Sequence, residues 1–155
     1  HNKYIEDFRA TNEEPNVADL IPAAGGSVSL VRNTVVAAMA MDYKNKTIYI
    51  LDDTNDSKYL ELSRALGCKH LIRPDVGVAK KAGNLNYGNE HITDAEWLFV
   101  LDADFVPRRE ALRELVPYAN GDVAIGQSPQ HFRQTDDGYY RSKCEFGASM
   151  IQKYL

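Results

Sequence analysis

The chain has 155 residues, enough for one globular domain whose core needs neither disulfides nor a structural metal. Its 22 acidic residues outnumber 18 basic ones, and the basic residues are scattered, which argues against a surface for nucleic acid or anionic membrane. No apolar run approaches the ~20 residues of a membrane span, and residues 1–16 are a polar lead-in that lacks the apolar core of a signal peptide.

Apolar runs closed by turn residues alternate with segments of helical character along the chain. The strand-like runs, in chain order, are residues 17–22, 46–53, 68–74, 96–102 and 122–127. The helical segments are residues 28–39, 56–66, 79–92, 108–119 and 139–155. This alternation indicates a mainly parallel sheet with right-handed crossovers and helices on both faces, a three-layer α/β/α fold.

Two of these helices carry specific expectations. Ser27 is a candidate cap for the first, and three- and four-residue spacing predicts its buried face as Val28, Val31, Val35, Val36 and Met39. The last helix has one apolar side without an obvious partner, formed by Tyr140, Cys144, Gly147, Ile151 and Leu155.

The two cysteines, Cys68 and Cys144, are far apart in the sequence, one in a strand-like run and the other in the last predicted helix. This favours free buried thiols in a reducing compartment over a disulfide. We therefore expect a cytoplasmic location, at the cytosolic face of a membrane if a longer parent protein is membrane-embedded.

Acidic pairs close two of the predicted strands. Asp52 and Asp53 end the second strand, and Asp102 and Asp104 end the fourth. In a doubly wound sheet, ligands bind outside the carboxyl ends of the strands, where the strand order reverses, so one rim is expected to carry all four carboxylates. Such carboxylates repel one another unless a cation lies between them, and hard oxygen ligands suit Mg²⁺ or Mn²⁺.

Aspartate is also common in turns after strands, where it accepts backbone hydrogen bonds. For Asp52 alone, this structural interpretation is as good as the functional one. For Asp102-Ala103-Asp104, directly after an apolar strand, the functional interpretation is favoured, because Ala103 gives the chain room to turn and offers no competing ligand.

The segment KKAGNLNYGNE, residues 80–90, combines small residues with a predicted helix start. Small residues let a backbone approach an anion, unpaired N–H groups at a helix start attract it, and Lys81 adds a positive charge, so the segment suits a diphosphate. An exposed basic helix start with Asn84 and Asn86 facing solvent explains the same residues, and both interpretations stay open.

Four segments, in this order, resemble the family 2 glycosyltransferases, in particular the cellulose-synthase-like members with the GT-A fold. They are residues 20–56, which resemble the opening strand, helix and second strand with its Asp52-Asp53, then KKAGNLN (80–86), FVLDADFVP (99–107) and GQSPQHF (126–132). The resemblance implies a nucleotide-sugar-binding, Rossmann-like GT-A domain over residues 17–132. Residues 133–155 would then be a helical segment leading toward an acceptor half outside this chain.

The resemblance also implies roles for the acidic and basic residues. Asp52 would accept a hydrogen bond from the uracil of a UDP-sugar, with Asp53 beside it, and Lys81 would lie near the nucleotide and its diphosphate. Asp102 would contact the nucleotide and share with Asp104 a metal ion, Mg²⁺ or Mn²⁺, on that diphosphate. Asp104 would be the more direct ligand, and the metal would stabilise the departing UDP.

Gln127 and His131 would lie toward the sugar and the acceptor. The implied reaction transfers a hexose with inversion, glucose being the expected sugar, to a glycan or polysaccharide acceptor.

The sequence departs from the family pattern in two places. Ala23-Ala24 stands where the family has a polar and aromatic pair that holds the nucleobase, so we expect weaker nucleotide binding. The family's catalytic base lies in a Glu-Asp motif downstream of the D-x-D, whereas the only Glu-Asp here is Glu6-Asp7, and the family's Gln-x-x-Arg-Trp is absent. We expect the isolated chain to be catalytically incomplete.

Two other functions compete with this interpretation. A non-catalytic nucleotide-binding or scaffolding module would keep the fold alone. A haloacid-dehalogenase-like phosphatase also has D-x-D after an apolar strand, with Asp102 as nucleophile and Asp104 as acid. That scheme needs a downstream lysine, but the first one is Lys143, and it leaves KKAGNLN unexplained.

Overall fold

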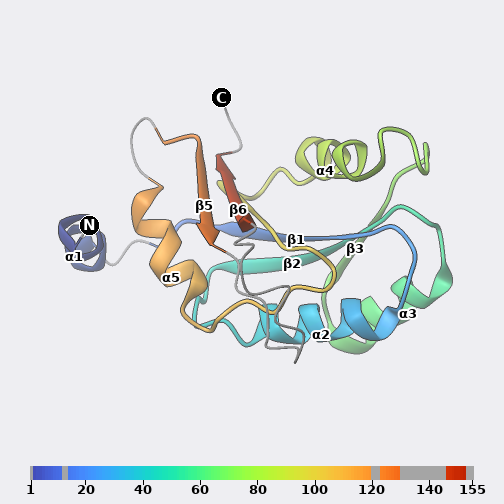
Figure 1. The fold of residues 1–155 in the computed structure, drawn as a ribbon, viewed down its shortest axis with the longest axis horizontal. Coiled ribbons are helices and arrows are strands. Elements are labelled where there is room, and N and C mark those ends of the chain that lie inside the picture. Colours follow the sequence, from blue (N-terminus) through green and yellow to red (C-terminus); the bar gives the residue numbers. More distant parts are fainter. Residues whose placement is uncertain (1, 12–13, 120–122, 130–145, 153–155) are drawn as a thin grey trace, which may run out of the picture.

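The computed structural model describes residues 2–11, 14–119, 123–129 and 146–152 (Figure 1). The strands are β1 (Val17–Ala23), β2 (Lys46–Asp52), β3 (Lys69–Ile72), β4 (Trp97–Val100), β5 (Ile125–Pro129) and β6 (Phe146–Gln152). The helices are α1 (Asn2–Thr11), α2 (Val28–Met39), α3 (Ser57–Leu66), α4 (Lys80–His91), α5 (Ala111–Leu115) and the 3₁₀ turn η1 (Val116–Tyr118).

The described strands form one sheet in the order β3-β2-β1-β4-β6-β5. The first four strands of that order are parallel, and β6 pairs antiparallel with both β4 and β5. Figure 1 shows α2 and α3 on one face of the sheet and α4 on the other. Since the chain moves from β2 and β3 on one side of β1 to β4 on the other, the strand order reverses at β1, where open α/β sheets bind ligands.

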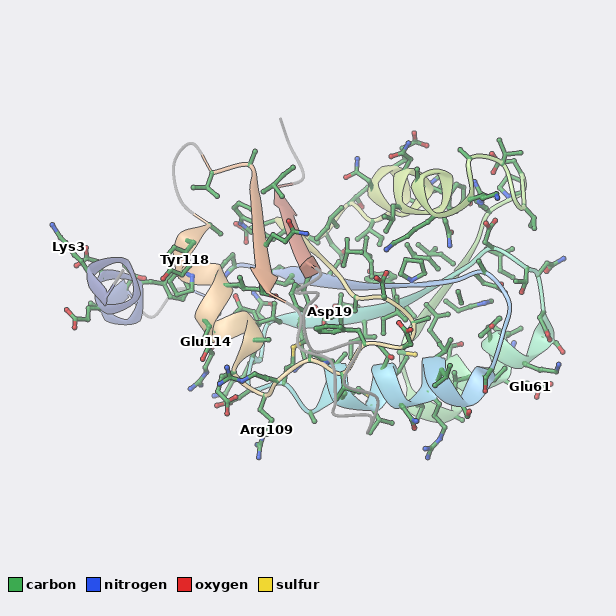
Figure 2. All side chains as sticks on the ribbon, viewed as in Figure 1. Lys3, Asp19, Glu61, Arg109, Glu114 and Tyr118 are labelled. Atoms are coloured by element: carbon green, nitrogen blue, oxygen red, sulfur yellow. The ribbon has the colours of Figure 1, made fainter. Side chains whose placement is uncertain are left out.

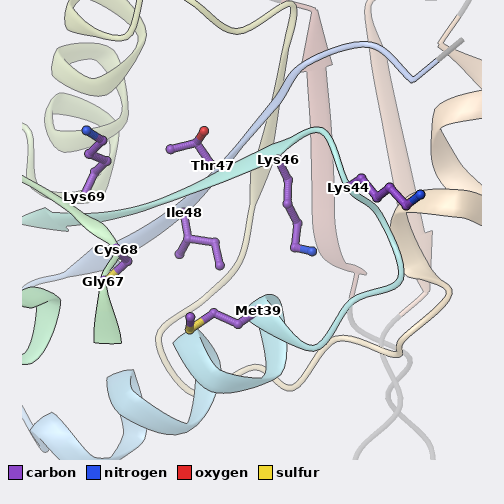
Figure 3. A pocket seen from close by; sticks show the side chains of 8 residues that line it. All are labelled: Met39, Lys44, Lys46, Thr47, Ile48, Gly67, Cys68 and Lys69. Carbon is purple, nitrogen blue, oxygen red and sulfur yellow. The ribbon is translucent and has the colours of Figure 1, made fainter. Parts of the chain in front are cut away.

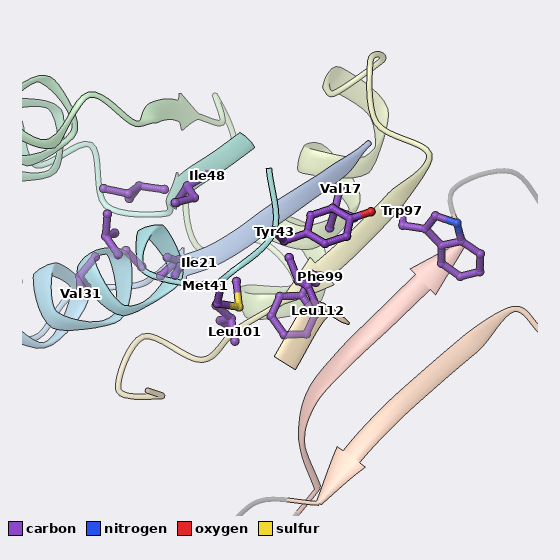
Figure 4. Close-up of a cluster of buried hydrophobic side chains, with 14 of the residues drawn as sticks. Val17, Ile21, Val31, Met41, Tyr43, Ile48, Trp97, Phe99, Leu101 and Leu112 are labelled. Carbon is purple, nitrogen blue, oxygen red and sulfur yellow. The ribbon is translucent and has the colours of Figure 1, made fainter. Parts of the chain in front are cut away.

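Strand β1 is buried on both faces, as a central parallel strand should be. Val17 and Ile21 pack in the larger core, which β1 shares with α2, α3 and α5 (Figure 4). Ala18 and Leu20 face a smaller core beneath α4. The two cores fix the sheet between its helices and leave the carboxyl ends of β1, β2 and β4 at a common edge.

The helix predicted over residues 139–155 is wrong where the structure describes it. Residues 146–152 form β6, which hydrogen-bonds to β4 on the side away from β1. The helical spacing of apolar residues extends over too few residues to exclude a strand. The edge of β4 that does not pair with β1 is the partner of this strand. Strand β5 also runs antiparallel to its neighbour, so the sheet is parallel only over β3, β2, β1 and β4.

Two helices differ from their sequence-based description. In α2, the buried face is Val31, Thr34, Val35 and Ala38, while Val36 and Met39 are 42% and 45% exposed. The buried stripe repeats at three and four residues from Val31, and Val36 lies one step off it. The helix predicted over residues 108–119 is shorter and ends in the 3₁₀ turn η1, where Pro117 has no N–H to continue an α-helix.

Asp19, in the middle of β1, is fully buried, and neither carboxylate oxygen has a hydrogen-bond partner among the described residues (Figure 2). Burial raises the pKa of this carboxyl well above its ordinary value, and the charge of Lys46 offsets only part of the effect. Burial therefore favours the uncharged form of Asp19 in the folded core.

The N-terminal polar segment contains the helix α1, which the sequence did not predict. Among the described helices, none has the length and apolarity required to cross a membrane.

Candidate functional site

The carboxyl ends of β1, β2 and β4 form the rim at which the strand order reverses. The register places Ala23 of β1 beside Asp52 of β2, and Leu101, directly after β4, donates its N–H to the carbonyl of Leu20 in β1. Figure 1 shows the connections to α2, α3 and α4 at this same end of the sheet. The structure thus brings both predicted acidic pairs to one edge.

Asp52 is completely buried, and both of its carboxylate oxygens are used inside the protein. Oδ1 accepts hydrogen bonds from the backbone N–H (2.8 Å) and the hydroxyl (2.7 Å) of Thr54. Oδ2 lies 3.2 Å from Nε2 of His70, whose side chain is 6% exposed. These contacts hold the turn after β2 and leave Asp52 no exposed oxygen for a ligand.

Asp53 is also buried, and its recorded contacts fall on one oxygen. Oδ1 accepts hydrogen bonds from Nε of Arg73 (2.6 Å) and from the backbone N–H of Gly77 (2.8 Å). The Arg73 hydrogen bond is the main reason that the pKa of this carboxyl is lowered. Its own N–H donates to the carbonyl of Ala23 (2.8 Å), which ties the residue to β1.

Asp102 and Asp104 are the accessible pair. Asp102 follows β4 with a half-exposed side chain that is ion-paired with the ammonium group of Lys81, and Asp104 is exposed. The turn between them is fixed to α2, because the buried Thr34 hydroxyl donates a hydrogen bond (2.8 Å) to the carbonyl of Ala103.

The expected repulsion among four rim carboxylates does not arise in this arrangement. His70 and Thr54 satisfy Asp52, Arg73 neutralises Asp53, and Lys81 neutralises Asp102. A cation is therefore not required to hold the β2 pair in place, which corrects the electrostatic premise drawn from the sequence. Within the described residues, no group of three or more His, Cys, Asp or Glu side chains is placed to hold a metal.

Lys81 lies in the first turn of α4, at the segment predicted to hold a diphosphate. The N-terminus of α4 has an unusual backbone, because Ala79 and Lys80 have φ of 53° and 47°. Of the two asparagines expected to face solvent, Asn86 is exposed, but Asn84 is buried and donates a hydrogen bond (2.7 Å) to the carbonyl of Leu51. Asn84 thus fastens α4 to β2.

Gln127, one of the two residues predicted for the sugar and acceptor side, lies apart from the β2 end of the rim. Gln127 is exposed on β5 and pairs in register with Ser149 of β6, which pairs with Val100 at the end of β4. Gln127 is therefore two strand spacings, roughly 10 Å, from the strand that leads into the D-x-D turn. His131 lies outside the described residues.

A pocket of about 280 Å³ opens at the opposite edge of the sheet (Figure 3). It is lined by the end of α2, the starts of β2 and β3, and the loop after α3, through Met39, Lys44, Lys46, Thr47, Ile48, Gly67, Cys68 and Lys69. None of the predicted site residues lines it. Burial raises the pKa of the half-buried Cys68 thiol there.

Known protein families include one that matches most of this chain. A family model described as Glycosyl transferase family 2 matches residues 20–154. This chain belongs to glycosyltransferase family 2. The match leaves the haloacid-dehalogenase-like alternative without support.

Curated relatives of this family 2 domain include cellulose synthase catalytic subunits. The chain is 34% identical over 129 residues to cellulose synthase 1 catalytic subunit (UDP-forming) of Komagataeibacter xylinus. It is 36% identical over 128 residues to the cellulose synthase catalytic subunit (UDP-forming) of Pseudomonas fluorescens strain SBW25. The alignments cover 81% and 80% of this chain but only 17% of each relative.

Solved structures share the fold. A mannosyltransferase from Pyrobaculum calidifontis, in complex with GDP-Man and Mn²⁺, superposes with a TM-score of 0.68 at 15% identity, covering 97% of this chain and 51% of that chain. Glucosyl-3-phosphoglycerate synthase from Mycobacterium tuberculosis, in complex with Mn²⁺, UDP-glucose and glycerol 3-phosphate, gives 0.64 at 16% identity, covering 96% and 61%. The α/β GT-A fold predicted from the sequence is confirmed.

Proposed function

We propose that this family 2 domain binds a UDP-sugar with Mg²⁺ or Mn²⁺ and supplies the donor half of a hexosyltransferase that transfers sugar with inversion to a glycan acceptor. The observation that carries the proposal is the accessible Asp102–Lys81 pair, with Asp104 beside it, at the point where the strand order reverses. UDP-glucose is the proposed donor and a polysaccharide the proposed acceptor, in line with relatives that are UDP-forming cellulose synthase subunits.

The donor atoms present fit a divalent metal of this kind. Mg²⁺ and Mn²⁺ at nucleotide sites take one or two carboxylates and complete their shell with water and phosphate oxygens. Asp102 and Asp104 provide two carboxylates on one short turn, and no third acidic ligand from the described residues is needed. When bound, the metal would neutralise the charge that develops on the departing diphosphate.

We assign the contact with the nucleobase to Asp53 instead of Asp52. Both oxygens of Asp52 are committed to Thr54 and His70, whereas the recorded contacts of Asp53 leave Oδ2 available. Because the pKa of Asp53 is lowered, this oxygen is a carboxylate at neutral pH and suits the imide N–H of uracil.

Lys81 serves the other end of the nucleotide in this proposal. Its side chain is 52% exposed, so its ammonium group can move from Asp102 to a phosphate oxygen without a change in the backbone. That move frees Asp102 for the metal. The same lysine therefore neutralises the carboxylate before the donor binds and the diphosphate afterwards.

The family's base motif does not follow the D-x-D in this sequence, so we propose that these 155 residues bind the donor but transfer sugar poorly by themselves. A non-catalytic nucleotide-binding module remains the alternative, and it differs in its requirement for metal at Asp104.

Calorimetric titration of UDP into the protein, with and without Mn²⁺, tests the proposal. We expect binding that requires Mn²⁺ and that weakens at least about 10-fold in Asp104→Ala, in the range typical of lost metal ligation. Glu61→Ala, which removes an exposed carboxylate on α3, is the matched control and should bind like the wild type.

Binding that is unaffected by Mn²⁺ and by Asp104→Ala would favour the non-catalytic module. Absence of UDP binding under both conditions would remove the proposal altogether.

A further inference from the structure

Arg73 lies just after β3 and is among the most deeply buried side chains of the described chain, 1% exposed. An arginine cannot lose its charge in a protein, so a buried guanidinium persists only where several acceptors surround it. No role for Arg73 follows from the proposed contacts with the nucleotide or the metal.

The guanidinium of Arg73 joins two parts of the rim. Its Nε donates to Oδ1 of Asp53 (2.6 Å), at the end of β2. Its Nη1 donates to the carbonyl of Val78 (2.5 Å), and Nη2 lies 3.5 Å from the carbonyl of Lys80. One planar group therefore holds the acidic end of β2 and the backbone that starts α4.

The backbone that Arg73 holds is strained. Ala79 and Lys80 both have left-handed φ angles, which are costly for residues with a Cβ and persist only where neighbouring contacts enforce them. Lys81 follows directly, so the position of its side chain depends on this enforced turn.

Gly83 supplies the space that Arg73 needs. A Cβ at this position would lie 2.3 Å from Nη1 of Arg73 and 2.3 Å from the carbonyl of Val78. The glycine in the Lys-Ala-Gly-Asn segment therefore makes room for the guanidinium and its hydrogen bond.

We propose that Arg73 is a positioning residue that places Lys81 for the diphosphate by fixing the start of α4 to Asp53. This inference rests on the proposed function, because it assumes that Lys81 acts on the bound nucleotide. Arg73 itself is too deeply buried to touch the ligand.

A double-mutant cycle separates this role from a general contribution to folding. Arg73→Lys keeps the charge and can still reach Asp53, but it loses the planar fork that spans the two carbonyls. UDP binding in the presence of Mn²⁺ is titrated for wild type, Arg73→Lys, Lys81→Met and the double variant. Thermal unfolding of each variant identifies any loss of folded protein.

We expect Arg73→Lys to weaken UDP binding about 10-fold or more, as changes to supporting residues do. In the Lys81→Met background, the same substitution should change affinity by no more than about 2-fold, the range of additivity error. Arg64→Lys, at an exposed arginine of α3, is the matched control and should have no effect in either background.

Equal weakening by Arg73→Lys in both backgrounds would overturn the positioning role. If Arg73→Lys does not fold, Gly83→Ala replaces it, since the added Cβ displaces both the guanidinium and the Val78 carbonyl that it binds, and the same dependence on Lys81 is expected. Failure of the wild type to bind UDP with Mn²⁺ would instead overturn the proposed function.

Discussion

The ends of β2 and β4 carry the same residue type in the same position of the fold, yet they differ in access. At the end of β2, Asp52 and Asp53 are buried and bonded to His70, Thr54 and Arg73. At the end of β4, Asp102 and Asp104 are accessible. Asp102 forms an ion pair with Lys81, whose long side chain is half-exposed. The β2 pair is thus held mainly by the protein, and only Oδ2 of Asp53 is proposed to meet a ligand, whereas both carboxylates of the β4 pair are accessible.

The largest expected effect is on stability, and it tests the structural role of Asp53. Asp53→Ala leaves the Arg73 guanidinium buried without its carboxylate, which should lower the free energy of unfolding by about 3 to 5 kcal/mol. Asp104→Ala, at an exposed position, should change it by no more than about 0.5 kcal/mol. Urea denaturation at pH 7 measures both. Similar losses in the two variants would contradict the division of roles.

The contribution of Asp53 to stability depends on pH. Since the pKa of Asp53 is lowered in the folded protein, its contribution is fully present above the unfolded value, about 3.9, and is lost as the pH falls through the folded value. The difference between wild type and Asp53→Ala should therefore shrink in acid.

A smaller effect comes from Asp19, a third kind of carboxylate that is buried without a partner. Its pKa is raised, so its contribution is present below about pH 3.9 and is lost as the pH rises toward the folded value. Asp19→Asn has nearly the same shape and no charge. It should make stability less dependent on pH above about 4 and raise the free energy of unfolding at pH 7, because the amide is uncharged without taking up a proton. An unchanged pH dependence in the variant would contradict the raised pKa of Asp19.

The smallest expected effect is on the affinity for UDP, at Ala24. Ala24, exposed after β1, stands where related enzymes are expected to carry an aromatic residue against the nucleobase. Ala24→Tyr should tighten UDP binding about 5-fold, since stacking a base on an aromatic ring contributes about 1 kcal/mol or more. Calorimetry with UDP measures this gain, and inorganic diphosphate, which has no base, should bind both proteins equally.

Local sequence patterns predicted the parts of the fold that depend on near neighbours. The first four strands, the helix ended by Gly67 and the exposed D-x-D after β4 are all encoded within short segments. Strand β6 was missed because its identity depends on pairing with β4, about fifty residues earlier in the chain.

The supporting residues of the rim were missed for a similar reason. Arg73, His70 and Thr34 act on partners 20, 18 and 69 residues away, and none stands in a recognisable motif. One signal was available: a buried acidic pair at a strand end requires counter-charges, and Arg73 and His70 lie on the adjacent third strand and its end. Pattern alone did not say which of Asp52 and Asp53 would keep an oxygen free.

The close approach of Gly83 to Arg73 links two positions ten residues apart in the sequence. A side chain at position 83 and an arginine at position 73 exclude each other in this geometry. Because the carbonyl of Val78 would lie as close to that Cβ as Arg73 does, the loss of Arg73 alone does not make room for a side chain at position 83. Homologous chains that keep the turn before α4 should therefore keep Gly83, and chains that replace Gly83 should differ both at position 73 and in this turn.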